Sequence, residues 1–225
     1  PTVIAHRGAS ALRPEHTLAA YQKAIDDGAN IIEPDLVITK DGVLVARHEN
    51  AIAILNADGS VREATTDVMD RPEFAARKTT KTIDGTAITG WFVEDFTLAE
   101  LKTLRARERI PAIRPANVAY NGQFEVPTLQ EVIDLAKAQS AAKGRVIGIA
   151  PETKHPSFFQ SIGMPLEPAL LAVLTKNGWN SKDAPVYVQS FEVANLKALR
   201  KQSTVRLVQL LSSGGRPYDF TASGN

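Results

Sequence analysis

The sequence contains no cysteine, which excludes disulfide bonds and thiolate metal sites. Aromatic residues amount to only 6%, which argues against a surface that stacks nucleic-acid bases. Neither sign of charge predominates, because the formal net charge is +1, so no strong overall field attracts nucleic acid. No apolar run reaches the ~18 residues of a membrane-spanning helix. The sequence thus predicts neither a nucleic-acid partner nor a membrane span.

At 225 residues, with 44% hydrophobic and 23% charged residues, the chain has the composition of an ordinary globular protein with a large core. We expect one domain or a large part of one. No signal peptide is recognisable, and a chain that begins at Pro1 is interpreted as a processed or engineered product.

Apolar strand patterns alternate with helix patterns along most of the chain, which predicts a mostly parallel sheet wrapped by helices. Two capping boxes, Thr97–Glu100 and Thr128–Glu131, begin two of the helices. We expect strands at 2–5, 30–35, 43–46, 146–152, 186–190 and 205–211, and further helices at 17–27, 166–176 and 192–201.

The fold class indicated is α/β, an eight-stranded barrel of the TIM type. Such a barrel typically needs about 250 residues. Residues 50–125 interrupt the alternation after the third strand and are interpreted as an insertion subdomain that shapes a pocket. We therefore predict that residues 1–225 form one barrel domain whose last two units are absent from this chain.

The loop after Asp35 is too short for a helical crossover, so we expect a hairpin at Asp41-Gly42. A two-residue loop pairs Lys40 with Val43. The same register places Asp35 opposite His48, with Cβ atoms about 5 Å apart.

Three carboxylates follow apolar strand patterns: Glu33 and Asp35, on one face of one strand, and Glu152 on another. Grouped together they would repel one another, and a divalent cation resolves this repulsion. Hard oxygen ligands without cysteine suit Mg²⁺ or Ca²⁺ better than zinc. Surface charge is the alternative, and for Glu33 alone it is the better one; the three together favour a metal site.

His6 and His48 each end an apolar strand pattern, where barrel enzymes place catalytic groups, and imidazole suits proton transfer near neutral pH. A lone histidine is more often structural, but two at matching strand ends favour an acid–base pair. We expect His16 to cap or pack a helix. His155 is assigned to a loop, with a lesser chance of lining the pocket.

Two cations accompany these groups. Arg7 follows His6, and Lys154 shares a face with Glu152. Arginine grips two phosphate oxygens at once, whereas lysine acts as a point charge. The charges of three carboxylates, a divalent cation, these two side chains and one phosphodiester cancel, which a buried site tolerates best. Gly8 is expected to end the first strand and let the backbone approach a ligand closely.

The chain resembles the glycerophosphodiester phosphodiesterases along nearly its whole length, and its insertion resembles that of the bacterial periplasmic branch. The resemblance is carried by His6-Arg7-Gly8, Pro14-Glu15-His16-Thr17, Glu33-Pro34-Asp35, Arg47-His48-Glu49, Pro151-Glu152-Thr153-Lys154 and Val188-Gln189-Ser190-Phe191.

The resemblance implies a barrel of the phospholipase-C-like phosphodiesterase kind, one divalent cation, and hydrolysis of small glycerophosphodiesters to glycerol 3-phosphate and an alcohol. It implies a periplasmic or secreted location. His6 and His48 would be catalytic, Glu33, Asp35 and Glu152 metal ligands, and Arg7 and Lys154 phosphate-binding. Supporting roles would fall to Glu15, Glu49 and Gln189.

Two departures from the family pattern stand out: Glu49 replaces the usual aspartate, and the closing strands are missing. The nearest rival is a phospholipase-D-like phosphodiesterase acting on lysophospholipid or sphingomyelin, and a more distant one is a non-catalytic phosphodiester-binding protein. We assign His6 as base and His48 as acid. Attack by water and attack by the neighbouring glycerol hydroxyl both remain open.

Overall fold

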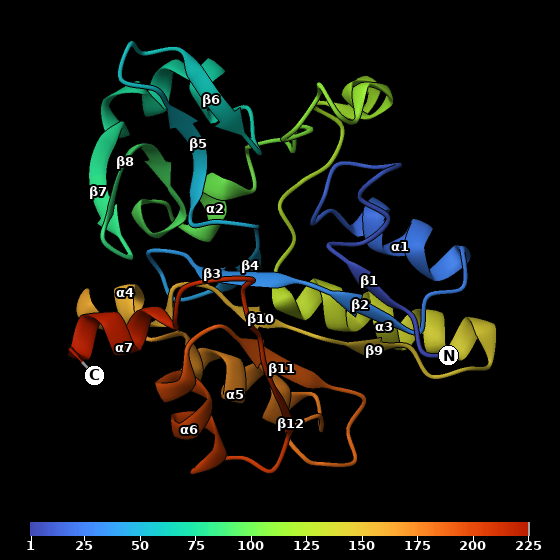
Figure 1. Ribbon diagram of the computed structural model, residues 1–225. Coiled ribbons are helices and arrows are strands. Elements are labelled where there is room, and N and C mark those ends of the chain that lie inside the picture. The colour runs from blue at the N-terminus through green and yellow to red at the C-terminus, as the bar shows by residue number, and fades with distance from the viewer. Residues whose placement is uncertain (225) are drawn as a thin grey trace.

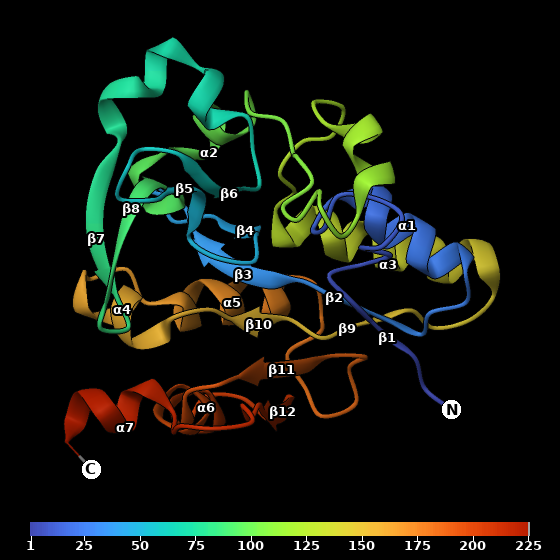
Figure 2. The ribbon, with the colours of Figure 1, turned by 45° about the horizontal axis from the view of Figure 1, so that its top comes forward.

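The computed structural model describes residues 1–224. Within them, short and mostly parallel strands form a wall flanked by helices, and a separate antiparallel sheet lies to one side (Figures 1 and 2). One part of the wall has the strand order β1-β2-β9 and the other β12-β11-β10-β3-β4. The wall strands are β1 Ile4–His6, β2 Ile31–Glu33, β3 Asp35–Ile38, β4 Leu44–Ala46, β9 Gly148–Ile149, β10 Glu152–Thr153, β11 Tyr187–Ser190 and β12 Arg206–Gln209.

The two parts of the wall share one register. Ile32 pairs with Ile149, and Asp35 pairs with Glu152, at the same sequence offset. Between these pairs Pro34 meets Pro151, and proline has no N–H to donate to the ladder. The amide of Glu152 still donates to the carbonyl of Pro34, at 2.9 Å. The wall is therefore continuous, and the two prolines only divide its strands.

These pairings confirm the predicted α/β class with parallel strands. Among residues 1–224 the strand order is linear, with β12 at one edge, so the described strands form an open wall and not a closed barrel. Asp35 and Glu152 begin β3 and β10, whereas the sequence placed them at strand ends, because the chain stays extended beyond both prolines.

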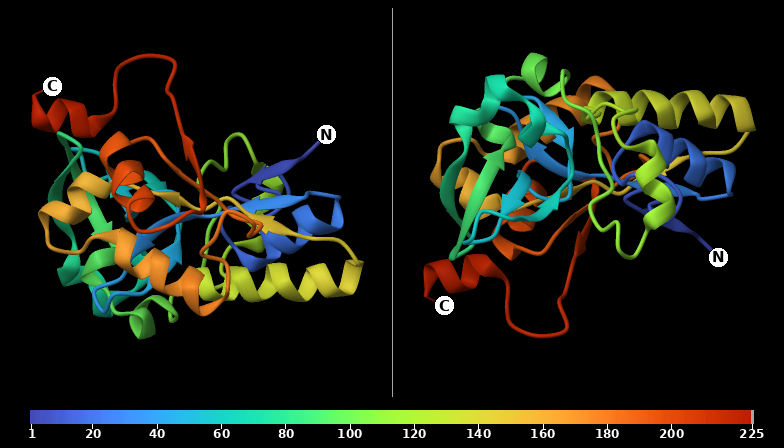
Figure 3. Two further views of the ribbon diagram at one scale, coloured as in Figure 1. Left: turned by 90° about the horizontal axis from the view of Figure 1, so that it is seen from below. Right: turned by 90° about the horizontal axis from the view of Figure 1, so that it is seen from above.

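Helices flank the wall, and α1 and α3 lie side by side along it (Figure 3). The helices of this part are α1 Leu18–Asp26, α3 Leu129–Lys143, α4 Pro156–Ser161, α5 Leu166–Lys176, α6 Val193–Arg200 and α7 Tyr218–Ser223. Both predicted capping boxes are formed, at Thr97 and Thr128, and α5 has the predicted bounds. The sequence analysis expected no helix after residue 211, and the structure has α7 there.

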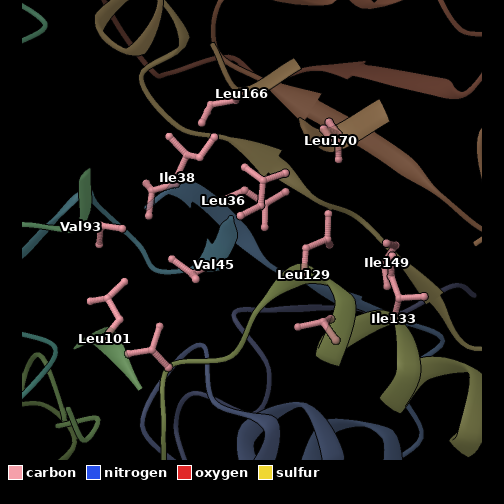
Figure 4. Close-up of a cluster of buried hydrophobic side chains, with 14 of the residues drawn as sticks. Leu36, Ile38, Val45, Val93, Leu101, Leu129, Ile133, Ile149, Leu166 and Leu170 are labelled. Carbon is pink, nitrogen blue, oxygen red and sulfur yellow. The ribbon is translucent and has the colours of Figure 1, made fainter. Parts of the chain in front are cut away.

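The core joins the strands to the flanking helices. Leu36 and Ile38 of the wall lie in one apolar cluster with Leu129 of α3 and Leu166 of α5 (Figure 4). Each is at most 5% exposed, so the apolar faces of α3 and α5 are covered by the wall. None of the described helices is long and apolar enough to cross a membrane.

Residues 50–125 contain a four-stranded antiparallel sheet in the order β6-β5-β8-β7, of which the sequence analysis identified no strand. Threonine and charged residues fill β7, and β6 is largely exposed, so neither has a clear apolar pattern. The elements are β5 Ala51–Leu55, β6 Val61–Ala64, β7 Thr79–Ile83, β8 Thr86–Phe92 and α2 Leu98–Leu101, with 3₁₀ turns at Val68–Asp70, Pro72–Arg77, Val93–Asp95 and Pro115–Tyr120.

The predicted hairpin between β3 and β4 is present, but its predicted register is wrong by one residue. Val37 pairs with Val45, and the amide of Thr39 donates to the carbonyl of Val43 at 2.9 Å. The loop therefore has three residues, with Gly42 in the left-handed region at φ +84°. Asp35 consequently lies opposite Arg47, whose amide donates to the Asp35 carbonyl at 3.0 Å, and not opposite His48.

Candidate active site

The three predicted metal ligands meet where the two parts of the wall join. Asp35 and Glu152 are paired residues of β3 and β10, and Glu33 precedes Asp35 by two positions on the same face. One oxygen of each carboxylate lies within 4.8 Å of one oxygen of the other two. All three residues are at most 5% exposed. The structure therefore brings together an acidic group that could hold a metal ion.

The electrostatics of this group fit a cation. Burial, together with the charge of Asp35, raises the pKa of Glu33 to about 10. Burial likewise raises the pKa of Glu152 to about 7, against the opposing pull of Lys154. Burial disfavours the charge of Asp35 too, but His16 overrides it and holds that pKa well below its usual range. Asp35 Oδ1 is buried and has no hydrogen-bond partner, so one acceptor atom of the acidic group is left for a cation to bind.

Arg7 and His6 reach the group from the end of β1. His6 pairs with Glu33 in the parallel register of β1 and β2. Arg7 adopts the left-handed conformation at φ 62°, and its amide donates to Glu33 Oε2 at 2.8 Å. Its guanidinium Nε lies 3.4 Å from Asp35 Oδ2. Backbone and side chain of Arg7 therefore both face the acidic group.

Gly8 follows β1, as predicted, and packs against the first turns of α1. A Cβ there would lie 2.7 Å from the carbonyl carbon of Ala20, and φ is +84°. The amide of Ala9 also donates to the carbonyl of Ala20, at 2.9 Å. Glycine is therefore needed for this close contact with α1, while the approach of the backbone to a ligand stays a prediction.

His48 follows β4 and Lys154 follows β10, and these two strands are the neighbours of β3 on either side. Lys154 Nζ is 3.1 Å from Glu152 Oε1. His48 Nε2 lies 3.5 Å from Glu49 Oε1, while its Nδ1 is buried and unpartnered. Burial lowers the pKa of His48 to about 3 and also lowers that of His6, so both rings are neutral near pH 7 in the ligand-free protein.

His16 was expected to cap or pack α1, and its contacts extend to the site. Thr17 supplies the cap, since its hydroxyl accepts from the amide of Ala20. His16 is fully buried, with Nε2 2.9 Å from Asp35 Oδ2 and Nδ1 2.7 Å from the hydroxyl of Tyr21. It therefore orients a predicted metal ligand. Its place beside Glu15 in a motif of the family was the signal available in the sequence.

Two of the supporting residues contact the site, one from β11 and one from the loop before α1. Gln189 lies beside Glu152 in β11, and its amide donates to Glu33 Oε1 at 3.0 Å. Glu15 is buried and binds Arg7 at 3.7 Å, and it accepts from Arg109 and Arg114 of the insertion at 2.7 and 3.1 Å. Sequence reasoning missed both of these arginines.

Arg47 forms a second link between the insertion and the wall. It is buried, and its guanidinium donates to the carbonyls of His16 at 2.7 Å and Thr65 at 3.0 Å. These bonds tie the loop that carries Glu15 and His16 to the segment after β6. Arg47 therefore supports the geometry of the motif in which it stands beside His48.

The assignment of His155 to a loop is confirmed, since it lies in the short loop before α4, in the left-handed conformation at φ 46°. Its Nδ1 lies 2.6 Å from Asp84 of the insertion, and its Nε2 bonds to Glu49. Asp84 was not identified from the sequence, because the only signal was an Asp-Gly turn.

The wall thus carries an acidic group with two cations against it and two histidines near the ends of neighbouring strands, a set of side chains suited to holding a metal ion and a phosphate. Comparison with known proteins makes this specific, because the model of the glycerophosphoryl diester phosphodiesterase family matches residues 6–222. The chain belongs to this family.

Relatives and solved structures agree with the assignment. The glycerophosphodiester phosphodiesterase GDPD6 of Arabidopsis thaliana is 39% identical over 208 residues, which are 87% of this chain and 51% of that protein. The Haemophilus influenzae glycerophosphodiester phosphodiesterase is 31% identical, over 93% of this chain and 56% of that protein. The chain thus spans about half the length of these curated relatives.

Among solved structures, an Oleispira antarctica phosphodiesterase in complex with the product sn-glycerol-3-phosphate superposes with a TM-score of 0.60 at 24% identity. The match covers 100% of this chain and 71% of that one. At this identity the similarity concerns the fold alone.

Proposed function

We propose that this protein is a metal-dependent glycerophosphodiester phosphodiesterase, which hydrolyses a glycerophosphodiester to glycerol 3-phosphate and an alcohol. The observation that carries the proposal is the meeting of Glu33, Asp35 and Glu152 with Arg7 and Lys154 at one point of the wall. Membership of the family and the activity named for its curated relatives support it.

Glu33, Asp35 and Glu152 would hold one divalent cation, Mg²⁺ or Ca²⁺. When bound, the ion supplies charge neutralisation for the phosphoryl oxygens. The chain's own contribution is electrostatic as well. The guanidinium of Arg7 and the ammonium of Lys154 each lie against one carboxylate of the group, from which they can also bind a phosphoryl oxygen.

The two imidazoles account for the proton transfers. His6, neutral in the ligand-free protein, accepts the proton of the attacking hydroxyl. His48 gives a proton to the departing alkoxide. Because its ring is neutral in the ligand-free protein, it has to take up this proton from solvent when the anionic substrate binds, and the carboxylate of Glu49, 3.5 Å from its Nε2, stabilises the resulting imidazolium. The attacking hydroxyl belongs to water or to the neighbouring glycerol hydroxyl, which would give a cyclic phosphate first.

A metal titration on glycerophosphocholine tests the proposal. We expect turnover that EDTA abolishes and that added Ca²⁺ or Mg²⁺ restores. His6→Ala and His48→Ala should each lower turnover by about 10²- to 10⁴-fold without loss of the folded state. Near-normal rates in both variants would contradict the assignment of the histidines. Preferential hydrolysis of lysophosphatidylcholine would favour the phospholipase-D-like alternative, and binding of glycerol 3-phosphate without turnover would favour a binding protein.

We also propose that the protein belongs to the bacterial periplasmic branch and acts in the periplasm or outside the cell, on the resemblance of its insertion. Fractionation of cells that produce the full-length protein tests this location, and recovery in the cytoplasmic fraction would contradict it.

A further inference from the structure

One hydrogen bond joins the turn of a hairpin in the insertion to the loop that follows β10 of the wall. Strands β7 and β8 are connected by Asp84 and Gly85, both with positive φ. This turn lies beside α4 in both views of the ribbon (Figures 1 and 2). Asp84 Oδ2 is 2.6 Å from His155 Nδ1, although the residues are 71 positions apart. The hairpin therefore ends on a residue that adjoins Lys154.

His155 connects this hairpin to a second carboxylate. Its other ring nitrogen, Nε2, bonds to Glu49 Oε2. A carboxylate only accepts hydrogen bonds, so a ring that lies between two carboxylates satisfies both by donating from both nitrogens, which makes it an imidazolium. Although burial favours the neutral ring, these two bonds raise the pKa of His155 to about 9. The charged ring fixes the direction of both bonds.

Glu49 lies between His155 and His48 and contacts both. While its Oε2 is held by His155, its Oε1 lies 3.5 Å from His48 Nε2 and 4.0 Å from Lys154 Nζ. A carboxylate is planar, so fixing one oxygen restricts where the other points. The longer side chain of Glu49, compared with an aspartate, gives it the reach to contact His155 and His48 at once.

We propose that Asp84 is a positioning residue, which holds His155 and, through His155, sets the Glu49 carboxylate that orients His48. The inference rests on the proposed function, in which His48 transfers a proton. In consequence the insertion, and not the wall alone, determines how well His48 is aligned. Losing alignment lowers the rate of the chemical step and leaves substrate binding largely intact.

The test compares Asp84→Asn with Asp95→Asn in the otherwise unchanged chain. Asp95 is a matched control, because it also belongs to the insertion and is ion-paired, but to Lys81, at 2.8 Å, and not to His155. We expect Asp84→Asn to lower kcat about 10- to 100-fold with KM close to that of the control. His155→Gln should have the same effect, and the double variant Asp84→Asn/His155→Gln no larger one, because the residues act in series.

A readout that does not depend on turnover completes the test. In protein with isotope-labelled histidine, the NMR signals of the His48 ring should shift in Asp84→Asn and in His155→Gln but not in Asp95→Asn. Unshifted His48 signals, or a kcat equal to that of the control, would overturn the proposal. If the unmodified protein fails to hydrolyse glycerophosphodiesters, the proposed function is wrong, whereas the NMR comparison still decides the coupling. Should Asp84→Asn not fold, His155→Gln decides.

Discussion

Asp35 and Glu152 are paired neighbours on two parallel strands, 117 positions apart in the chain, and their carboxylates face the same point. Such a pair is stable only if one group keeps its proton or if a cation lies between them. Burial is the main reason that the pKa of Glu152 is raised to about 7, and the negative charge of Asp35 adds to it. The stability of the metal-free protein should therefore depend on pH.

The metal-free protein should lose stability as the pH rises from 4.5 to about 7. Over this interval the unfolded chain releases the Glu152 proton more readily than the folded one, so the stabilisation present below pH 4.5 disappears as the pH passes the raised pKa. Added Ca²⁺ or Mg²⁺ should raise Tm more above this interval than below it. Thermal melting of Glu152→Gln is the control. It should show a smaller loss of stability over this interval and a smaller cation effect, because Glu33, whose pKa is raised to about 10, still titrates in that variant. Equal losses and equal cation effects in both proteins would contradict the prediction.

The hydrogen bonds of His155 should make the stability of the folded protein depend on pH in a second, more alkaline range. Its pKa is raised from 6.5 to about 9, so this stabilisation is complete below pH 6.5 and is lost as the pH rises through 9. One pKa unit corresponds to about 1.4 kcal/mol, so the loss is on the order of 3 kcal/mol. Urea unfolding across this range should show the decline in the unmodified protein and much less of it in His155→Gln. Parallel declines in the two proteins would refute this account.

Replacing Gly8 by alanine should destabilise the protein by roughly 2–4 kcal/mol, because a left-handed conformation and a clash with Ala20 act together. Gly28→Ala is the matched control. Gly28 also has positive φ, +100°, but nothing lies within 4 Å of a Cβ there, so its cost should be about 1 kcal/mol. Denaturant unfolding measures both, and equal losses would show that the contact with α1 is unimportant.

Glu15→Gln should cost about 3 kcal/mol of stability, because it leaves the guanidinium groups of Arg7, Arg109 and Arg114 without their shared carboxylate in a buried place. Glu63 binds Arg109 at 3.2 Å from a more exposed position, so Glu63→Gln should cost less than about 1 kcal/mol. Chemical denaturation of the two variants distinguishes them, and a Glu63→Gln loss as large as that of Glu15→Gln would be inconsistent with a buried ion-pair cluster.

Local patterns predicted a large part of this protein. The capping boxes at Thr97 and Thr128 and the helix 166–176 follow from interactions between residues a few positions apart. The shared face of Glu33 and Asp35 follows from the two-residue period of an extended strand. Such signals lie within one stretch of chain, so they survive without knowledge of the neighbours.

The register between β3 and β4 and the strands of the insertion were not predictable in this way. The hairpin loop has three residues because Thr39 pairs with Val43, and a shift of one position moves His48 away from Asp35. The strands β6 and β7 are held by pairing with β5 and β8, and their own threonine-rich or charged sequences have little apolar periodicity.

The residue types and their order along the chain therefore specified which chemistry is available: carboxylates, imidazoles and cations that follow apolar strands. Folding specified which of these groups meet. Asp84 reaches His155 over 71 positions, and Arg109 reaches Glu15 over 94. Contacts at such separations depend on how the insertion packs against the wall, and no periodicity within a single segment encodes that packing.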